Sequence, residues 1–173
     1  MEFRNCRRCG AELEPQSPSS FRCTAGHVIF YNPLPTTGVF IVTDDDQVML
    51  SVRGIEPHKG MLDSFGGFVD GAETLEQGLE RELREELGLE PDQYEPPTFL
   101  CSAVGQYPFG GETLTVLSSL FYTRLKPGVV PVPADDVAAI ETLDIATLDL
   151  SRLHDDDVRA GMRALRSALK HSA

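Results

Sequence analysis

The sequence predicts a mixed α/β (α+β) sandwich in which two helices pack on one sheet, preceded by a small separate segment. Two pairs of β-rich runs predict the sheet, and two stretches with helical periodicity predict the helices. Residues 1–32 are rich in Cys, Gly and Ser and lack this periodicity. We therefore expect two domains, 1–32 and 33–173.

The first β-rich runs are TGVFIVT (37–43) and QVMLSVR (47–53), and the three aspartates between them predict a hairpin. A glycine-rich stretch, 65–73, leads into a segment with helical periodicity. This segment, 74–87, is predicted to be a helix that ends at Gly88, because glycine is favoured just past the last helical turn.

The second pair of runs, 98–107 and 114–125, predicts another hairpin, and 137–145 predicts one more short strand. The final segment, 155–170, begins with acidic residues and ends with basic ones, as the helix dipole favours. Its apolar residues recur at helical spacing. It is therefore predicted to be a helix that packs on the sheet.

The charge of the chain limits the class of partner. The formal net charge is −12, which argues against a general nucleic-acid binder or a membrane-surface binder, since both need basic surfaces. A small anionic substrate is still compatible, because divalent cations can mediate the contact. The sequence shows no signal peptide and no run of about 20 apolar residues, and its cysteines do not form a disulfide pattern. A cytoplasmic setting is expected.

The helix at 74–87 places three acidic residues on one side. Four leucines at intervals of four, from Leu75 to Leu87, form its apolar stripe, and Glu82, Glu85 and Glu86 lie along one edge of it. Like charges at this spacing repel. One interpretation is a solvated surface helix with neighbouring arginines as partners. The other is a metal site, because three carboxylates on one turn suit Mg²⁺ or Mn²⁺.

The spacing of residues 67–89 resembles the Nudix box, GX5EX7REUXEEXGU with U aliphatic. Gly67 and Glu73 match its first two positions, and the segment RELREELGL (81–89) matches all the others. A looser resemblance extends over about 33–150. It implies a Nudix α/β/α sandwich with a mixed sheet, and an enzyme that hydrolyses a nucleoside diphosphate linked to another moiety with the help of Mg²⁺ or Mn²⁺.

The same resemblance assigns roles to individual residues. It implies metal coordination by Glu82, Glu85, Glu86 and the carbonyl of Gly67, with Glu73 completing or supporting the site. Arg81 would hold a glutamate in place through charge-assisted hydrogen bonds. A metal-activated water would attack phosphorus. Glu85 and Glu86 are the alternatives for the general base.

The N-terminal segment contains a second set of candidate ligands. Cys6 and Cys9 form a CxxC pair, and Cys23 and His27 follow. Three thiolates and one imidazole form a tetrahedral structural zinc site. The segment resembles the zinc ribbons attached to Nudix domains, although its last knuckle has one cysteine too few. A ribbon that no longer binds zinc and a redox role are the alternatives. Cys101, inside an apolar run, is expected in the core.

Two stretches are candidates for substrate binding. A zinc ribbon before a Nudix domain resembles the NADH pyrophosphatases, and 102–111 matches their downstream motif only in part. Tyr107 and Phe109 could stack on a substrate ring or simply pack. Upstream of the glycine-rich stretch lie three basic residues that could meet a phosphate: Arg53, His58 and Lys59.

The leading functional hypothesis is a metal-dependent pyrophosphohydrolase of a dinucleotide or nucleotide-sugar, such as NADH or ADP-ribose. The second is a hydrolase that removes modified nucleoside triphosphates. The third, from another class, is a catalytically silent nucleotide sensor, against which the intact box argues. The family resemblance is also compatible with a homodimer.

Overall fold

The chain forms two compact units, which divide between Pro33 and Leu34. The computed structural model describes residues 4–170. The outermost limits of the two predicted domains, residues 1–3 and 171–173, therefore lie outside the described residues. Each unit is described here by itself.

The N-terminal unit is a three-stranded antiparallel sheet in the order β1 (Leu13–Ser17), β2 (Ser20–Cys23) and β3 (Val28–Phe30). Its buried cluster contains only five residues, two of which are cysteines. Two turns with glycine at positive φ, Gly10 at 74° and Gly26 at 81°, connect the pieces. A core of this size supplies little folding free energy.

The second unit is a mixed sheet with two helices, as the sequence predicts. Its strand order is β10-β5-β4-β9-β8, in which β4 and β9 run parallel and the other pairs antiparallel. The long strands are β4 (Leu34–Val42), β5 (Gln47–Arg53), β8 (Thr98–Phe109), β9 (Glu112–Thr123) and β10 (Val137–Asp144). The helices are α1 (Leu75–Leu87) and α2 (Asp156–Lys170), and short 3-10 turns cover Pro91–Gln93 and Leu150–Arg152.

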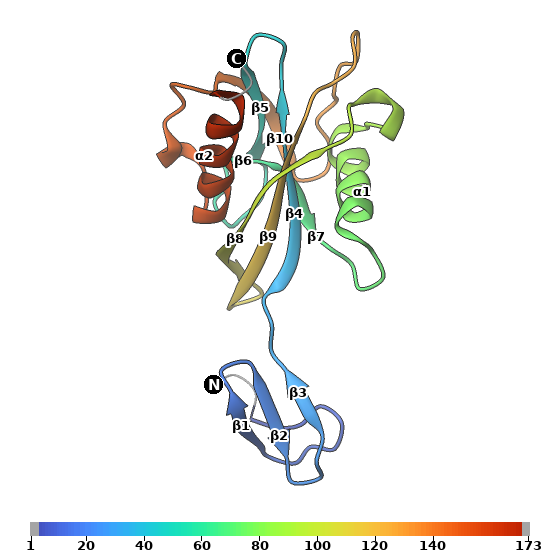
Figure 1. Ribbon diagram of the computed structural model, residues 1–173, viewed down its shortest axis with the longest axis vertical. Helices are drawn as coiled ribbons and strands as arrows, with labels where there is room; N and C mark the ends of the chain where they lie inside the picture. Colours follow the sequence, from blue (N-terminus) through green and yellow to red (C-terminus); the bar gives the residue numbers. More distant parts are fainter. Residues whose placement is uncertain (1–3, 171–173) are drawn as a thin grey trace. The chain divides into compact units, whose positions relative to one another are not determined.

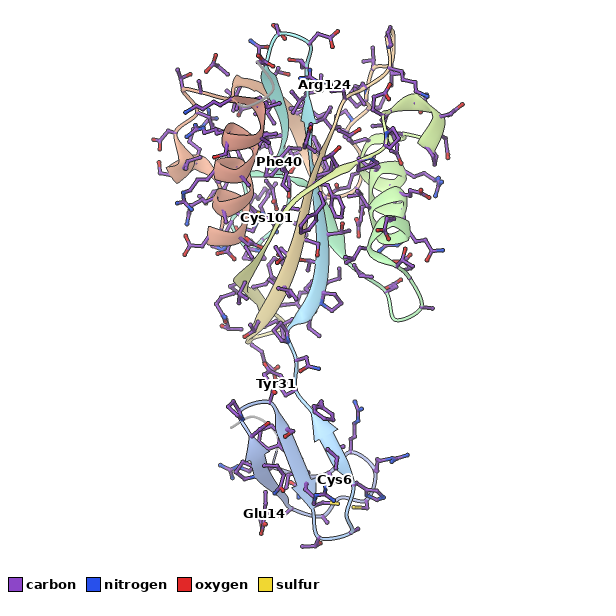
Figure 2. All side chains as sticks on the ribbon, viewed as in Figure 1. Cys6, Glu14, Tyr31, Phe40, Cys101 and Arg124 are labelled. Carbon is purple, nitrogen blue, oxygen red and sulfur yellow. The ribbon has the colours of Figure 1, made fainter. Side chains whose placement is uncertain are left out.

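The two helices cover opposite faces of the sheet (Figure 1). Side chains alternate between the faces along a strand. On β4, therefore, Val39 packs in the cluster that includes the leucines of α1, and Phe40 packs in the cluster with α2. Figure 2 labels Phe40 together with Cys101, which is partly buried against the same α2-side core, as expected.

The sheet opens between its two central strands. β4 and β5 pair only through Ile41 and Val42 with Met49 and Val48. Beyond this point two short strands fill the gap: β6 (Leu62–Asp63) pairs with β5, and β7 (Phe65–Phe68) pairs with β4. The opening therefore brings a short acidic and glycine-rich segment next to α1.

Helix α1 has well-defined ends. Thr74 is its N-cap and forms a capping box with Gln77, and Gly88 ends it in the left-handed conformation with φ 65°. These caps fix the first and last turns, and with them the register of the three glutamates. Neither helix within residues 4–170 has the length and apolar character required to cross a membrane.

Candidate functional site

A cavity of about 370 Å³ lies where the sheet opens, bordered by α1, β4, β7, β9 and the start of α2. Its lining is strongly acidic. The carboxyl groups belong to Asp63, Asp70, Glu82, Glu85, Glu86, Asp135, Asp136, Asp155 and Asp157. Two arginines, Arg53 and Arg81, also line it, and both are ion-paired. An anionic ligand would therefore need cations that the protein itself does not provide here.

Glu86 is the most deeply placed glutamate of α1. It is 7% exposed, and its carboxylate accepts a hydrogen bond from the Gly66 N–H at 2.8 Å. Burial raises the pKa of Glu86 to about 9, and the charges of Glu82, Asp63 and Asp136 add to this effect. Within residues 4–170 no cationic side chain forms an ion pair with it. Glu86 is thus a buried acid whose ionised form lacks a counter-charge.

The other glutamates of the motif are held by one arginine. Arg81 Nε and Nη2 donate to Glu73 at 2.9 and 3.1 Å, and Nη1 donates to Glu82 at 2.8 Å and to Glu85 at 3.0 Å. Nη2 also donates to the Phe68 carbonyl at 2.9 Å. A planar guanidinium can satisfy several acceptors at fixed angles. Arg81 therefore joins the glycine-rich loop to the acidic edge of α1.

Gly67 lies directly against this edge. A Cβ atom at position 67 would lie 2.5 Å from Glu82 Oε1, which is closer than such atoms can approach. A side chain here would displace the carboxylate. The glycine at the start of the motif is therefore explained by the close approach of the loop to Glu82.

The far wall of the cavity is a hydrogen-bonded chain of four side chains from separate segments. Asp63 Oδ2 lies 2.7 Å from Arg53 Nη1 and 2.9 Å from His154 Nε2. Arg53 Nη2 in turn donates to the Tyr107 hydroxyl at 3.2 Å. The Tyr107 ring meets Phe68 edge to face, with centroids 5.7 Å apart. This wall thus adds the aromatic rings of Tyr107 and Phe68 to the lining of the cavity.

The structure brings together some of the predicted substrate residues and not others. Arg53 and Tyr107 line the cavity, whereas His58, Lys59 and Phe109 are outside its lining. Phe109 is 63% exposed and stacks on Tyr107 at 6.4 Å. Five further lining residues are not marked by any motif spacing in the sequence: Asp63, Asp135, Asp136, His154 and Asp157.

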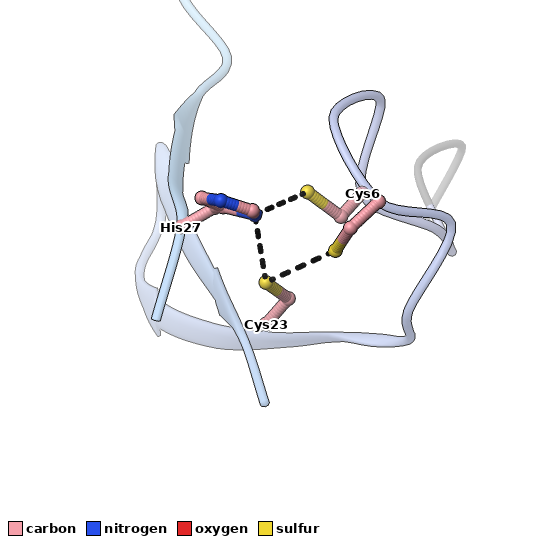
Figure 3. A group of neighbouring side chains, drawn as sticks. Cys6, Cys23 and His27 are labelled. Carbon is pink, nitrogen blue, oxygen red and sulfur yellow. Dashed lines mark hydrogen bonds between the residues drawn. The ribbon is translucent and has the colours of Figure 1, made fainter. Parts of the chain in front are cut away.

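The N-terminal unit brings its four candidate ligands together (Figure 3). The Cys9 and Cys23 sulfurs are 3.7 Å apart, and His27 Nδ1 lies 3.7 Å from Cys6 Sγ and 3.6 Å from Cys23 Sγ. Ligands of a tetrahedral zinc ion are separated by about 3.8 Å between sulfurs and about 3.6 Å between sulfur and nitrogen. The four side chains therefore fit a metal ion of this size.

The chain matches the family model described as NUDIX domain over residues 32–164. This match covers most of the chain, and the chain therefore belongs to the Nudix family. The fold agrees with this. A NUDIX hydrolase from Nitrosomonas europaea superposes with a TM-score of 0.68 and 19% identity, covering 93% of this chain and 89% of that structure.

Two curated relatives are larger proteins. The mouse mitochondrial NAD(P)H pyrophosphatase NUDT13 is 26% identical over 152 residues, which cover 85% of this chain and 41% of the relative. The NAD-capped RNA hydrolase NudC of Stutzerimonas stutzeri is 28% identical over 108 residues, covering 62% of this chain and 38% of the relative. The chain thus spans less than half the length of these relatives.

Proposed function

We propose that the protein is a divalent-metal-dependent hydrolase that cleaves the diphosphate of a nucleoside diphosphate linked to another moiety, such as NADH or ADP-ribose. The observation that carries this proposal is that Glu82, Glu85 and Glu86 line one cavity together with Gly66 and Gly67, with Glu86 buried and lacking a counter-charge. The activity in the names of the two relatives supports the same reaction.

The donor set fits Mg²⁺ or Mn²⁺. The three glutamates and the Gly67 carbonyl offer hard oxygen ligands. The cation would supply the positive counter-charge that the Glu86 carboxylate lacks. When bound, divalent ions neutralise phosphate oxygens and lower the pKa of a water molecule. The negative lining excludes direct phosphate binding, because both of its arginines already pair with carboxylates.

The chain's own residues position these groups. Arg81 fixes Glu82 and Glu85 relative to Glu73, and the Gly66 N–H fixes Glu86. Glu85 and Glu86 are the two candidates for accepting the proton of the attacking water. Comparison of Glu85→Gln with Glu86→Gln distinguishes them, since loss of the proton acceptor lowers kcat more than it weakens metal binding.

The wall that contains Arg53 and Tyr107 supports a substrate with a heteroaromatic ring. The Tyr107 ring is held by Arg53 Nη2 through its hydroxyl and by Phe68 through an edge contact. A ring fixed in this way can stack on a base at little entropic cost. Arg53, whose Nη1 pairs with Asp63 at 2.7 Å, therefore acts by orienting Tyr107.

A substrate panel tests the proposed function. NADH, ADP-ribose, nucleotide-sugars and modified nucleoside triphosphates would each be incubated with Mg²⁺ or with EDTA, and the products identified by mass. We expect Mg²⁺-dependent cleavage within the diphosphate of NADH or ADP-ribose. Cleavage of only the triphosphates would instead support the role in removing modified nucleotides, and binding without turnover would support the sensor.

We further propose that Cys6, Cys9, Cys23 and His27 hold a structural zinc ion. Burial opposes ionisation of Cys6, but backbone hydrogen bonds from Arg8 and Cys9 outweigh it and lower the pKa of Cys6 to about 6, which favours the thiolate that binds metal. With five buried residues as its core, the unit needs a further source of folding free energy, and metal binding supplies one. Such thiols require a reducing compartment such as the cytoplasm.

Elemental analysis of protein purified without chelators tests the zinc proposal. We expect about one zinc per chain, lost in Cys9→Ser and retained in Cys101→Ser, because Cys101 lies outside the cluster. Equal zinc contents in the two variants would exclude this site, and zinc-free wild-type protein would favour a ribbon that no longer binds metal.

A further inference from the structure

The cavity extends through the opening of the sheet to its α2 side. We call this part the α2 lobe and define it by four lining residues: Thr36, Ser118, His154 and Asp157. Thr36 and Ser118 are partners in the β4–β9 register and lie on the strand face that also carries Phe40 and Leu120, the face covered by α2. The lobe is thus separate from the glutamates of α1, which lie on the opposite face.

A directed chain of hydrogen bonds runs through the lobe and ends on a carboxylate. Thr36 Oγ1 donates to Ser118 Oγ at 2.7 Å, and Ser118 Oγ donates to Asp157 Oδ2. Asp157 Oδ1 accepts the Val158 N–H at 2.7 Å. Asp157 is only 7% exposed, and within residues 4–170 it forms no ion pair. Its charge is therefore supported by hydrogen bonds alone.

His154 adds a second acceptor. Its Nε2 lies 2.9 Å from Asp63 Oδ2, which assigns the proton to Nε2 and leaves Nδ1 as an acceptor. The His154 side chain is 7% exposed, and its Nδ1 has no hydrogen-bond partner in the described part of the chain. A buried acceptor without a donor is unfavourable, so Nδ1 marks a place where a donor is missing.

The chemistry of the lobe selects the group that it can hold. Its acceptors are a carboxylate, an imidazole nitrogen and two hydroxyls, and Arg53, which also lines the cavity, is already bound to Asp63 and Tyr107. A phosphate is repelled here, whereas hydroxyl groups satisfy the acceptors. Gly105 packs closely against this carboxylate, because a Cβ atom there would lie 3.0 Å from Asp157 Oδ2.

We propose that the α2 lobe is a sugar subsite, in which Asp157 and Ser118 bind the free vicinal hydroxyls of a substrate ribose. This inference rests on the proposed function and narrows its substrate class to nucleotides whose ribose is not phosphorylated. A carboxylate that accepts a ribose hydroxyl excludes a 2′-phosphate by charge repulsion, as in dinucleotide-binding folds. Asp157 is therefore a specificity-determining residue.

The ratio of kcat/KM for NADH to kcat/KM for NADPH tests this subsite. We expect the wild type to prefer NADH, and Asp157→Asn to reduce the ratio about tenfold or more, because the near-isosteric amide removes the negative charge, which weakens acceptance of the ribose hydroxyl and abolishes the repulsion of a 2′-phosphate. Asp156→Asn is the matched control. It makes the same charge change at the preceding residue, whose side chain is 84% exposed, and it should leave the ratio unchanged. An unchanged ratio in Asp157→Asn, or an equal change in Asp156→Asn, would overturn the proposal.

A second variant and a binding measurement keep the subsite testable in every case. If Asp157→Asn does not fold, Ser118→Ala should reduce the same ratio by about threefold. If the wild type cleaves neither dinucleotide, the dinucleotide part of the proposed function is wrong, and the subsite is tested independently of turnover by calorimetry with ADP-ribose and its 2′-phosphate in the presence of Ca²⁺. Tighter binding of ADP-ribose by the wild type but not by Asp157→Asn would support the lobe, and equal discrimination by both would contradict it.

Discussion

Glu86 shows how a single side chain can be unfavourable for folding and still be explained by function. The residue is 7% exposed, and its carboxylate lies near Glu82, Asp63 and Asp136. Among residues 4–170, the carboxylate is hydrogen-bonded only to the Gly66 N–H. Burying a charge without a partner opposes folding. At the proposed metal site, a bound cation would reverse this balance, and Glu86 would then couple metal binding to stability.

Replacement of Glu86 by Gln is expected to raise the free energy of unfolding in EDTA by about 1 to 3 kcal/mol at neutral pH, since the amide oxygen keeps the Gly66 hydrogen bond and the variant avoids the cost of protonating a buried carboxylate whose pKa is raised to about 9. The same variant should lose the stabilisation that Mg²⁺ gives the wild type. Urea denaturation with EDTA and with Mg²⁺ measures both effects. Glu80→Gln, an exposed position on the same helix, should behave as the wild type. A variant less stable than the wild type in EDTA would contradict this reasoning.

Replacement of Gly67 by Ala tests the close approach of the loop to α1. The added Cβ atom would displace the Glu82 carboxylate from 2.5 Å, and misplacing a catalytic group by about 1 Å can lower the rate about 100-fold. The control is Gly71→Ala in the same loop, where nothing lies within 4 Å of the added atom. Steady-state kinetics should show a large loss of kcat for position 67 and little change for position 71. Similar rates for the two variants would show that the contact is unimportant.

At the scale of single residues, the sequence predicts which side chains lie together only where a helix fixes their spacing. Glu82, Glu85 and Glu86 fall on one edge of α1 because 3.6 residues complete a turn, whatever the tertiary contacts. Asp63 and His154, by contrast, meet only because residues 153–154 pair with β6, through the Leu62–Leu153 bridge and the bond from the His154 N–H to the Leu62 carbonyl. No local sequence pattern predicts such a contact.

Helix α1 is the element on which the acidic site depends. Its N-terminal cap orients the first turn and its glycine ends the last, while the leucine stripe packs in the core that includes Val39 and Phe65. Each of these features was predictable, because each follows from a local rule of helix formation. The strands β6 and β7 were not predictable, since they are too short to show periodicity and exist only where β4 and β5 separate.

Removal of the N-cap should weaken α1 without removing its chemistry. Thr74→Ala loses the hydrogen bond from the Gln77 N–H, and we expect a loss of about 1 kcal/mol of stability. Thr74→Ser, which keeps the hydroxyl, should lose much less. Thermal denaturation and kcat under conditions where each protein is folded would separate the two effects. A fall in kcat of more than about tenfold in the folded Ala variant would mean that the cap also positions the glutamates.

On the scale of the whole molecule, the chain combines a small unit that gathers three cysteines and one histidine with a larger Nudix unit. The family, the mixed sheet and the two helices were predictable, because the Nudix box joins a glycine-rich loop and a helix at fixed spacing. The α2 lobe was not predictable, because Thr36, Ser118 and Asp157 come from three elements far apart in the sequence. The specificity that we propose for the α2 lobe thus depends on tertiary contacts more than on the motif.

The measurement that most directly tests diphosphate cleavage at α1 is turnover in ¹⁸O-labelled water. The wild type with Mg²⁺ and NADH or ADP-ribose should form two monophosphates, one of which carries a single ¹⁸O from water, and Glu86→Gln should form neither above background. Mass spectrometry of the products reads both the bond broken and the origin of the oxygen. Products without ¹⁸O in a phosphate, or equal turnover by Glu86→Gln, would contradict the assignment of the reaction to this site.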